Sequence, residues 1–155
     1  TRELDSHIAE LLVPYLNHEE NTFVISSDFC HWGSRFNYTS YIPAKGSSLS
    51  LLVTMDRFTK IEQPIYKSIE ELDKLAMQVV STGSYARWKK YINSTDNTIC
   101  GQKAVGIVLR MLEIYAEQEN LSYKNSFQWI NYSQSSQVQR YSDSSVSYAS
   151  GYLVV

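Results

Sequence analysis

The sequence predicts an α/β protein in which helices flank a central sheet, and three features support this fold class. The first is an apolar stripe with helical spacing near the N-terminus. The second is the short β-branched and aromatic run Thr22–Ser26, which has the length of a buried strand and leads into a polar loop. The third is the segment 103–119, which is apolar almost all round, as helices inside layered folds usually are.

Length and composition fit a single globular domain. The chain has 155 residues, of which 43% are hydrophobic and 19% charged, and its formal net charge is −2. Scattered charges argue against a nucleic-acid-binding surface or a polybasic membrane anchor, and no stretch is apolar for long enough to span a bilayer. Two cysteines cannot build a multi-disulfide scaffold, so a reducing, cytoplasmic compartment is expected. Because the first residue is Thr and not Met, we expect a fragment or a processed piece, so that residues 1–155 are a single domain or a portion of one.

The first elements follow in order from the N-terminus. Residues 2–16 are predicted to form an amphipathic helix, whose apolar positions are Leu4, Ile8, Leu11, Leu12 and Tyr15. The strand Thr22–Ser26 should deliver its end to the loop Ser27–Gly33, because ligands gather beyond the strand ends of open α/β sheets. Residues 39–63 are predicted to be a surface insertion that contains an edge strand or a helical turn.

The remaining chain is predicted to form three helices and two strands. Helices are expected over 64–79, where Pro64 suits a first turn, over Tyr85–Ile92, and over 103–119 in the centre of the fold. Partial alternation of apolar and polar residues predicts strands over two further segments, which a Ser/Gln-rich loop at 133–145 would join. The two segments are Tyr123–Tyr132 and Val146–Val155.

Asp28 and His31 are candidates for acid–base chemistry because they lie three residues apart on one loop. An imidazole titrates near neutral pH, and a neighbouring carboxylate can orient it or share a proton with it. The alternative is structural: Asp28 would cap a turn while His31 packs beside Trp32.

Cys100 lies just before the predicted central helix, where unpaired N–H groups and the helix dipole favour a thiolate. Such a thiolate could bind a metal or act as a nucleophile, and the alternative is a buried structural thiol. Cys30 lies between two aromatic residues and is interpreted as a packing residue. His7 and His18 are interpreted as surface residues. Arg35 could bind an anionic substrate or form a salt bridge.

Several reaction classes lose support because their motifs are missing. The sequence has no zinc-ligand spacing, no glycine-rich phosphate loop and no nucleophile-elbow sequence. A Cys–His hydrolase with Cys100 as the nucleophile remains open on chemical grounds.

The loop after the first predicted strand continues as SSDFCHWGSRFNY (Ser26–Tyr38) and closely resembles a signature of the Memo family. Further blocks match in the same order: IYKSIEELDK (Ile65–Lys74), NTICG (Asn97–Gly101), NYSQSS (Asn131–Ser136) and DSSVSYASG (Asp143–Gly151). The resemblance covers nearly the whole chain apart from 39–63. It implies the fold of class III non-haem-iron extradiol dioxygenases, of which this chain would be the C-terminal half.

The resemblance also implies roles for individual residues. His31 matches the acid/base histidine of the related dioxygenases, and Asp28 matches the acidic residue beside it. Cys100 matches a metal ligand that stands where the dioxygenases have a glutamate. The other two ligands would be histidines outside this chain, in the N-terminal half. The soft sulfur ligand shifts the preference toward copper or a more covalent iron site and argues against ring cleavage.

Two functions follow from the resemblance. The first is a metal-dependent redox protein, with iron or copper held in a cleft, that acts in receptor-driven cell motility, cell signalling or redox regulation in the cytoplasm or nucleus. The second is a non-enzymatic module that binds a phosphotyrosine-containing peptide of a signalling receptor in the same cleft. In the second case Trp32 and Arg35 are expected to contact the ligand. No nucleic acid is an expected partner.

Overall fold

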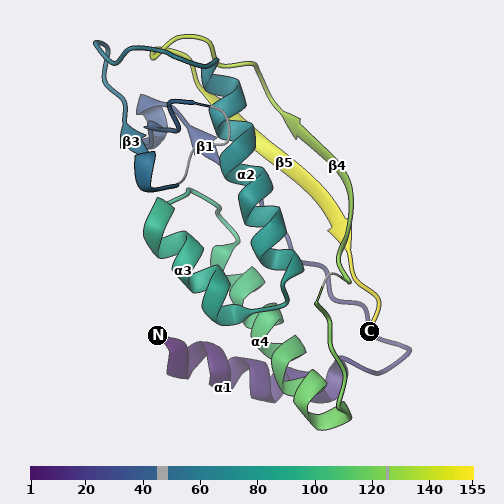
Figure 1. The fold of residues 1–155 in the computed structure, drawn as a ribbon. Helices are drawn as coiled ribbons and strands as arrows, with labels where there is room; N and C mark the ends of the chain where they lie inside the picture. The colour runs from purple at the N-terminus through teal and green to yellow at the C-terminus, as the bar shows by residue number, and fades with distance from the viewer. Residues whose placement is uncertain (45–48, 125) are drawn as a thin grey trace.

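The structure is a computed structural model that describes residues 1–44, 49–124 and 126–155. Helices and a curved antiparallel sheet form its two layers (Figure 1). The helices are α1 (Arg2–Leu12), α2 (Ile65–Ser81), α3 (Tyr85–Thr95) and α4 (Gln102–Glu119), with 3₁₀ turns at Val13–Tyr15, Ser34–Phe36 and Leu49–Leu51. The strands are β1 (His31–Trp32), β2 (Ser40–Tyr41), β3 (Val53–Thr54), β4 (Gln128–Gln134) and β5 (Ser145–Tyr152). The predicted mixture of helices and strands is confirmed.

The larger sheet has the strand order β1-β5-β4, and all its pairings are antiparallel. His31 pairs with Val146, so the short strand β1 lies at one edge of this sheet. The strands β2 and β3 form a separate antiparallel pair. The site loop is therefore attached to the sheet through β5, which lies more than 100 residues away in the sequence.

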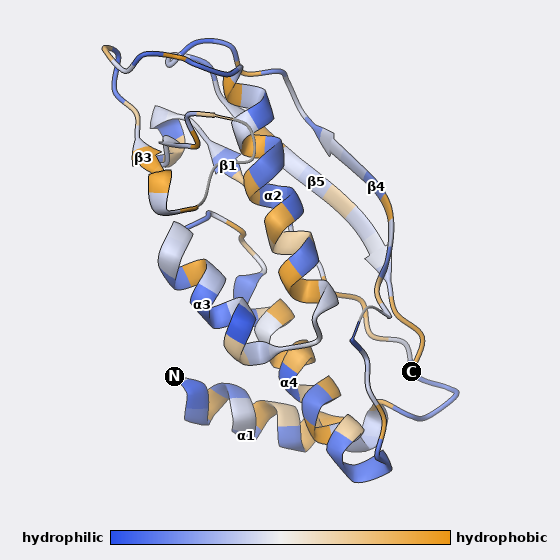
Figure 2. Cartoon of the chain, in the orientation of Figure 1, coloured by the Kyte–Doolittle hydropathy of each residue, from blue (hydrophilic) through white to orange (hydrophobic). Residues whose placement is uncertain are grey.

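Helix α2 covers one face of the larger sheet along its whole length (Figure 1). Three β4 side chains hydrogen-bond to it at successive levels: Gln134 Nε2 donates to Tyr66 O at 2.9 Å, Tyr132 Oη donates to Asp73 Oδ2 at 2.8 Å, and Trp129 Nε1 donates to Ser81 Oγ at 2.9 Å. Hydrophobic and hydrophilic residues alternate along α2 (Figure 2). The helix is amphipathic, and its apolar side meets the core.

Helix α2 connects two hydrophobic clusters of the core. One cluster lies around Trp88 and includes Ala76 and Val80 of α2. The other contains Ile65, Ile69 and the fully buried Trp32. Burial of large apolar side chains is the main favourable term in folding, so α2 holds the site loop in place through packing as well as through hydrogen bonds.

The helix predictions are confirmed with small differences at the ends. Helix α1 continues as a 3₁₀ turn to Tyr15, so the two together end one residue before the end of the predicted span 2–16. Helix α3 extends three residues beyond the predicted Ile92. Helix α4 packs between α1 and α3 rather than against the sheet, and its Ile107 and Val108 are only half-buried. Its buried Leu109 and Met111 belong to two different core clusters, so its expected place inside the fold is confirmed, with helices as its main neighbours.

The predicted strand Thr22–Ser26 is wrong. This segment has no regular secondary structure, and its Val24 side chain is 86% exposed. The chain pairs with the sheet only later, where Phe29 N donates to Ser147 O at 2.8 Å and Ser147 N donates to Cys30 O at 2.9 Å. β-branched residues favour a strand only where a partner strand is available, and Thr22–Ser26 has none among the described residues.

The expected flanking of a central sheet by helices is also corrected. Helix α2 covers one face of β4 and β5, whereas the opposite face exposes Ile130, Tyr148 and Tyr152. The sheet is antiparallel, so the argument from the strand ends of an open α/β sheet does not apply. The predicted strand at 146–155 is confirmed as β5, while the strand predicted from Tyr123 begins only at Gln128.

The segment 39–63, predicted to be a surface insertion, is only partly at the surface. Its described residues include β2 and β3, and Tyr41, Ile42 and Met55 are buried. The Tyr41 hydroxyl accepts hydrogen bonds from Glu62 N and Gln63 N, which fixes the end of the segment. Lys45–Ser48 lie outside the described residues. Each helix that the structure describes is too short or too polar to cross a lipid bilayer.

Candidate functional site

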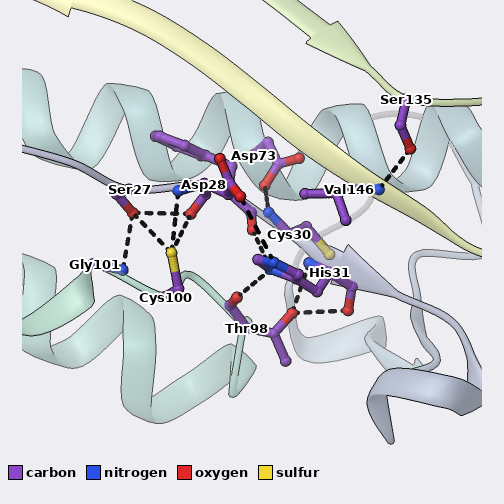
Figure 3. A network of polar contacts seen from close by, with 11 residues as sticks. Ser27, Asp28, Cys30, His31, Asp73, Thr98, Cys100, Gly101, Ser135 and Val146 are labelled. Carbon is purple, nitrogen blue, oxygen red and sulfur yellow. Dashed lines mark hydrogen bonds and ion pairs between the residues drawn. The ribbon is translucent and has the colours of Figure 1, made fainter.

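The candidate site lies where the extended segment Ser27–His31 meets the loop Thr98–Gly101 (Figure 3). Gly101 allows this approach because a Cβ atom there would lie 2.4 Å from Ser27 Cβ and 2.8 Å from Ser26 O. Gly101 N also donates a hydrogen bond to Ser27 Oγ at 3.0 Å. The residues predicted from the sequence lie on both segments, and the structure brings the two segments together.

Cys100 is an exposed free thiol whose sulfur contacts the backbone of Asp28. Asp28 N donates a hydrogen bond to Cys100 Sγ at 3.2 Å, and Asp28 O lies 3.8 Å from the same sulfur. Ser27 Oγ lies 4.0 Å away (Figure 3). The interpretation of Cys100 as a buried structural thiol is therefore wrong, because the residue is exposed.

Cys30 behaves as the sequence indicated. It is fully buried and packs among Trp32, Tyr38 and other side chains of the second cluster. Burial raises the pKa of the Cys30 thiol, and the nearby Asp73 carboxylate raises it further. Cys30 is an inert packing residue next to the site.

The orientation of His31 is fixed by contacts with two backbone carbonyls. His31 Nδ1 lies 3.0 Å from Phe29 O and 2.9 Å from Thr98 O. Because a carbonyl oxygen can only accept, we assign the proton of the neutral ring to Nδ1. Nε2 is then the nitrogen with a free lone pair, and it faces the Asp28 side. A backbone acceptor on one ring nitrogen is the usual way to orient the other for proton transfer or metal binding.

Thr98 joins His31 to the Cys100 loop. Its hydroxyl accepts a hydrogen bond from His31 N at 2.8 Å and donates one to His31 O at 2.9 Å. With the ring contact to Thr98 O, three interactions hold these two residues together (Figure 3). The imidazole of His31 also packs edge-on against Phe36, with ring centroids 5.2 Å apart.

Asp28 and His31 form a loose pair. Asp28 Oδ2 lies 4.0 Å from His31 Nε2, and the two side chains are 47% and 21% exposed. An ion pair this exposed and this long stabilises the fold little, because solvent screens it. The distance nevertheless leaves the carboxylate able to interact with a protonated imidazole.

Trp32 and Arg35 occupy different environments. Trp32 was expected to contact a ligand, but its indole is fully buried and Nε1 donates to Ser40 O at 2.8 Å, so it belongs to the core. Arg35 is exposed, and its guanidinium carbon lies 4.8 Å above the ring of Phe36. Since Phe36 contacts His31, the positive charge of Arg35 lies beside the site. His7 and His18 are exposed, as predicted.

The described residues do not by themselves gather a full set of metal-binding side chains. Within the described residues, no three His, Cys, Asp or Glu side chains are placed to hold one ion. A mononuclear iron site needs about three protein ligands. Two hollows among the described residues lie elsewhere, one beside Pro14 and Tyr115 and the other beside Gly83 and Leu121, and Cys100 lines neither of them.

Sequence reasoning missed Asp73, a buried residue that contacts the site segment at Cys30. Asp73 of α2 is fully buried, and its Oδ1 accepts hydrogen bonds from Cys30 N at 3.1 Å and Asn97 Nδ2 at 3.4 Å. Burial raises the pKa of the Asp73 carboxyl, although the hydroxyls of Ser147 and Tyr132 and the two amide donors oppose this shift. A carboxylate within the apolar stripe of a helix was the signal that could have identified it.

Comparison with known proteins gives a consistent match over the chain. A family model described as "Memo-like protein" matches residues 1–152. The "MEMO1 family protein MHO1" of Saccharomyces cerevisiae is 39% identical to this chain, over 99% of the chain and 48% of that protein. "Protein MEMO1" of Xenopus tropicalis is 38% identical, and "Protein MEMO1" of Homo sapiens is 36% identical, each over 97% of this chain and 44% of the relative. The chain spans about half the length of these curated relatives.

Proposed function

This chain belongs to the Memo-like protein family, and from that premise we propose that it supplies one side of a metal-capable site in a protein of cell signalling. In this proposal Cys100 is one metal ligand, His31 is the acid/base group and Asp28 is its carboxylate partner. Two further ligands, both histidines, come from outside the chain.

One observation carries the proposal: Asp28 contacts both reactive side chains. Its backbone N–H lies 3.2 Å from Cys100 Sγ, while its carboxylate lies 4.0 Å from His31 Nε2. A soft sulfur ligand and a proton-accepting nitrogen therefore flank a single residue. That is the arrangement a redox site needs when a substrate bound near the metal must gain or lose a proton.

The residues of this chain have separate tasks in the proposed site. His31 would accept or donate a proton at Nε2, because Nδ1 is occupied by backbone carbonyls. Asp28 would stabilise the protonated ring. The Cys100 sulfur would favour iron or copper over harder cations such as Mg²⁺. The described residues do not complete a centre, so the remaining ligands would have to come from the other half of the protein.

The family resemblance supports the cellular part of the proposal. It suggests a role in receptor-driven cell motility or in redox regulation, in the cytoplasm or nucleus, and a fold related to extradiol dioxygenases. Cysteine at position 100 gives the site a sulfur donor in place of the carboxylate that those dioxygenases use, which argues against ring cleavage.

The metal-ligand proposal can be tested with Co²⁺ as a spectroscopic probe and free imidazole as a substitute for the missing histidines. We expect a thiolate-to-cobalt absorption band only when imidazole is present. The band should disappear in Cys100→Ser and persist in Cys30→Ala, because Cys30 is buried. A wild-type chain without the band at any imidazole concentration, or a Cys100→Ser variant that keeps it, would overturn the proposal.

A second candidate function is binding of a phosphotyrosine-containing peptide without turnover. The exposed Arg35, held over Phe36 beside His31, supports it, because a guanidinium is well suited to bind a phosphate group. A fluorescence-polarisation titration should then give tighter binding of a phosphotyrosine peptide than of its unphosphorylated form, with a chelator present. Equal binding of the two peptides, or full affinity in Arg35→Gln, would exclude this function.

A further inference from the structure

The two segments of the candidate site share a single buried anchor on a third element. Asp73 of α2 accepts hydrogen bonds from Cys30 N, one residue before His31, and from Asn97 Nδ2, one residue before Thr98. The Asp73 carboxylate therefore contacts one segment at Cys30, just before His31, and the other segment at Asn97, just before Thr98. Figure 3 shows the hydrogen bond from Cys30 to Asp73, next to His31.

The anchor is itself held in place. Its other oxygen, Oδ2, accepts a hydrogen bond from Tyr132 Oη at 2.8 Å, and that hydroxyl in turn accepts one from Gln134 Nε2 at 2.9 Å. On the opposite side, Asn97 Nδ2 donates to Tyr91 Oη at 2.8 Å, and Tyr91 Oη donates to Leu72 O at 2.8 Å. The carboxylate is thus fixed by β4, by α2 itself and by the end of α3.

An unpaired carboxylate in an apolar core is costly, and no cation among the described residues forms an ion pair with Asp73. A hydrophobic residue would fill this helix position at lower cost if packing were its only task. The geometry therefore points to Asp73 as a positioning residue that sets the separation of the His31 imidazole and the Cys100 sulfur. The importance of those two groups rests on the proposed function, whereas the role of Asp73 in holding them does not depend on it.

Loss of the Asp73 carboxylate should affect specific contacts of the site. Without the Asp73 acceptor, Cys30 N and Asn97 Nδ2 lose their common partner, so the two segments are free to separate. Two contacts should then weaken: His31 Nδ1 to Thr98 O, and Asp28 N to Cys100 Sγ. Both can be observed by NMR with no metal or peptide present.

The test measures the His31 ring tautomer from its ¹⁵N shifts, and the hydrogen exchange of the Asp28 amide, with a chelator present. In Asp73→Ala we expect the ratio of the Nδ1–H to the Nε2–H tautomer to fall, and Asp28 exchange to accelerate, each by about fivefold, the effect of one net hydrogen bond. Asp73→Asn should retain wild-type values for both, because its amide oxygen can still accept from Cys30 N and Asn97 Nδ2.

The matched control is Val80→Ala, which removes buried side-chain atoms from the same helix without contacting Asp73. It should lower the melting temperature but leave the tautomer and the Asp28 exchange rate unchanged below the transition. If Val80→Ala changed the tautomer ratio and the Asp28 exchange rate as much as Asp73→Ala does, the Asp73 effect would be general destabilisation, and the inference would be overturned.

Unchanged His31 and Asp28 signals in a folded Asp73→Ala variant would also overturn it. If Asp73→Ala does not fold, Asn97→Ala decides the question, because it removes the link to the Thr98 segment, together with the hydrogen bond to Tyr91 Oη, and leaves the Asp73 bond to Cys30 N in place. We then expect the same two changes, and their absence would count against the inference. These outcomes do not depend on Co²⁺ or peptide binding, so a failed proposed function and a failed anchor can be told apart.

Discussion

The sulfur of Cys100 accepts a hydrogen bond from the backbone amide of Asp28 at 3.2 Å, although 72 residues separate the two in the sequence. This contact exists because a glycine follows the cysteine and because Thr98 binds His31 on the other side of the loop. Each of these supports can be removed by a single substitution.

Gly101→Ala should destabilise the chain by about 1–3 kcal/mol, the usual cost of adding a methyl group to a closely packed place. The new Cβ would lie 2.4 Å from Ser27 Cβ, so the two segments must move apart. Chemical denaturation would measure the loss. The control is Gly106→Ala in α4, where the nearest side-chain atoms lie at 3.5 Å and higher helix propensity should add up to about 1 kcal/mol. Equal effects at the two glycines would contradict this interpretation.

Thr98→Val should cost about 1–3 kcal/mol, because His31 N loses its acceptor and His31 O loses its donor. Valine keeps the shape of threonine but removes the hydroxyl. Thr98→Ser retains the hydroxyl and should lose clearly less stability. Thermal unfolding of both variants would check this, and a serine variant as unstable as the valine variant would show that the hydroxyl is not what matters.

Asp73 should give the stability of the fold a specific dependence on pH. Because burial raises its pKa in the folded state, folding favours the protonated form. Its contribution is fully present below the unfolded pKa of about 3.9 and is lost as the pH rises through the folded pKa, at about 1.4 kcal/mol for each unit of difference. The stability of the wild type relative to Asp73→Asn, which does not titrate there, should therefore decrease as pH rises above 4. Urea unfolding at several pH values would measure it, and a pH-independent difference would contradict the prediction.

Trp32→Phe should destabilise the chain by about 1–3 kcal/mol, since it leaves Ser40 O without its donor and creates a small cavity. It should leave the affinity for a phosphotyrosine peptide unchanged at a temperature where the variant is folded, because the indole is not accessible. Arg35→Gln should behave in the opposite way, with unchanged stability and weaker binding. A Trp32→Phe variant that is stable but no longer binds the peptide would show that Trp32 contributes to the binding site.

Local patterns predicted much of the secondary structure correctly. Apolar stripes identified α1 and α2, and a segment that is apolar almost all round identified α4, because both patterns are properties of neighbouring residues. The strand Thr22–Ser26 failed because a strand needs a partner, and the partner strand β5 pairs instead with the segment that begins at Phe29. The apolar character of α4 predicted its burial but not its neighbours, since an apolar helix does not specify which element it packs against.

By itself the sequence determined the family, through its motifs, and the chemical identity of the candidate groups, Asp28, His31 and Cys100. Only the tertiary structure decided that Cys100 is exposed and contacts Asp28, and that Trp32 is buried. It also decided that Asp73 accepts hydrogen bonds from both segments of the site. The physical reason is that side-chain chemistry is encoded residue by residue. Burial and hydrogen-bond partners, by contrast, depend on which distant segments pack together.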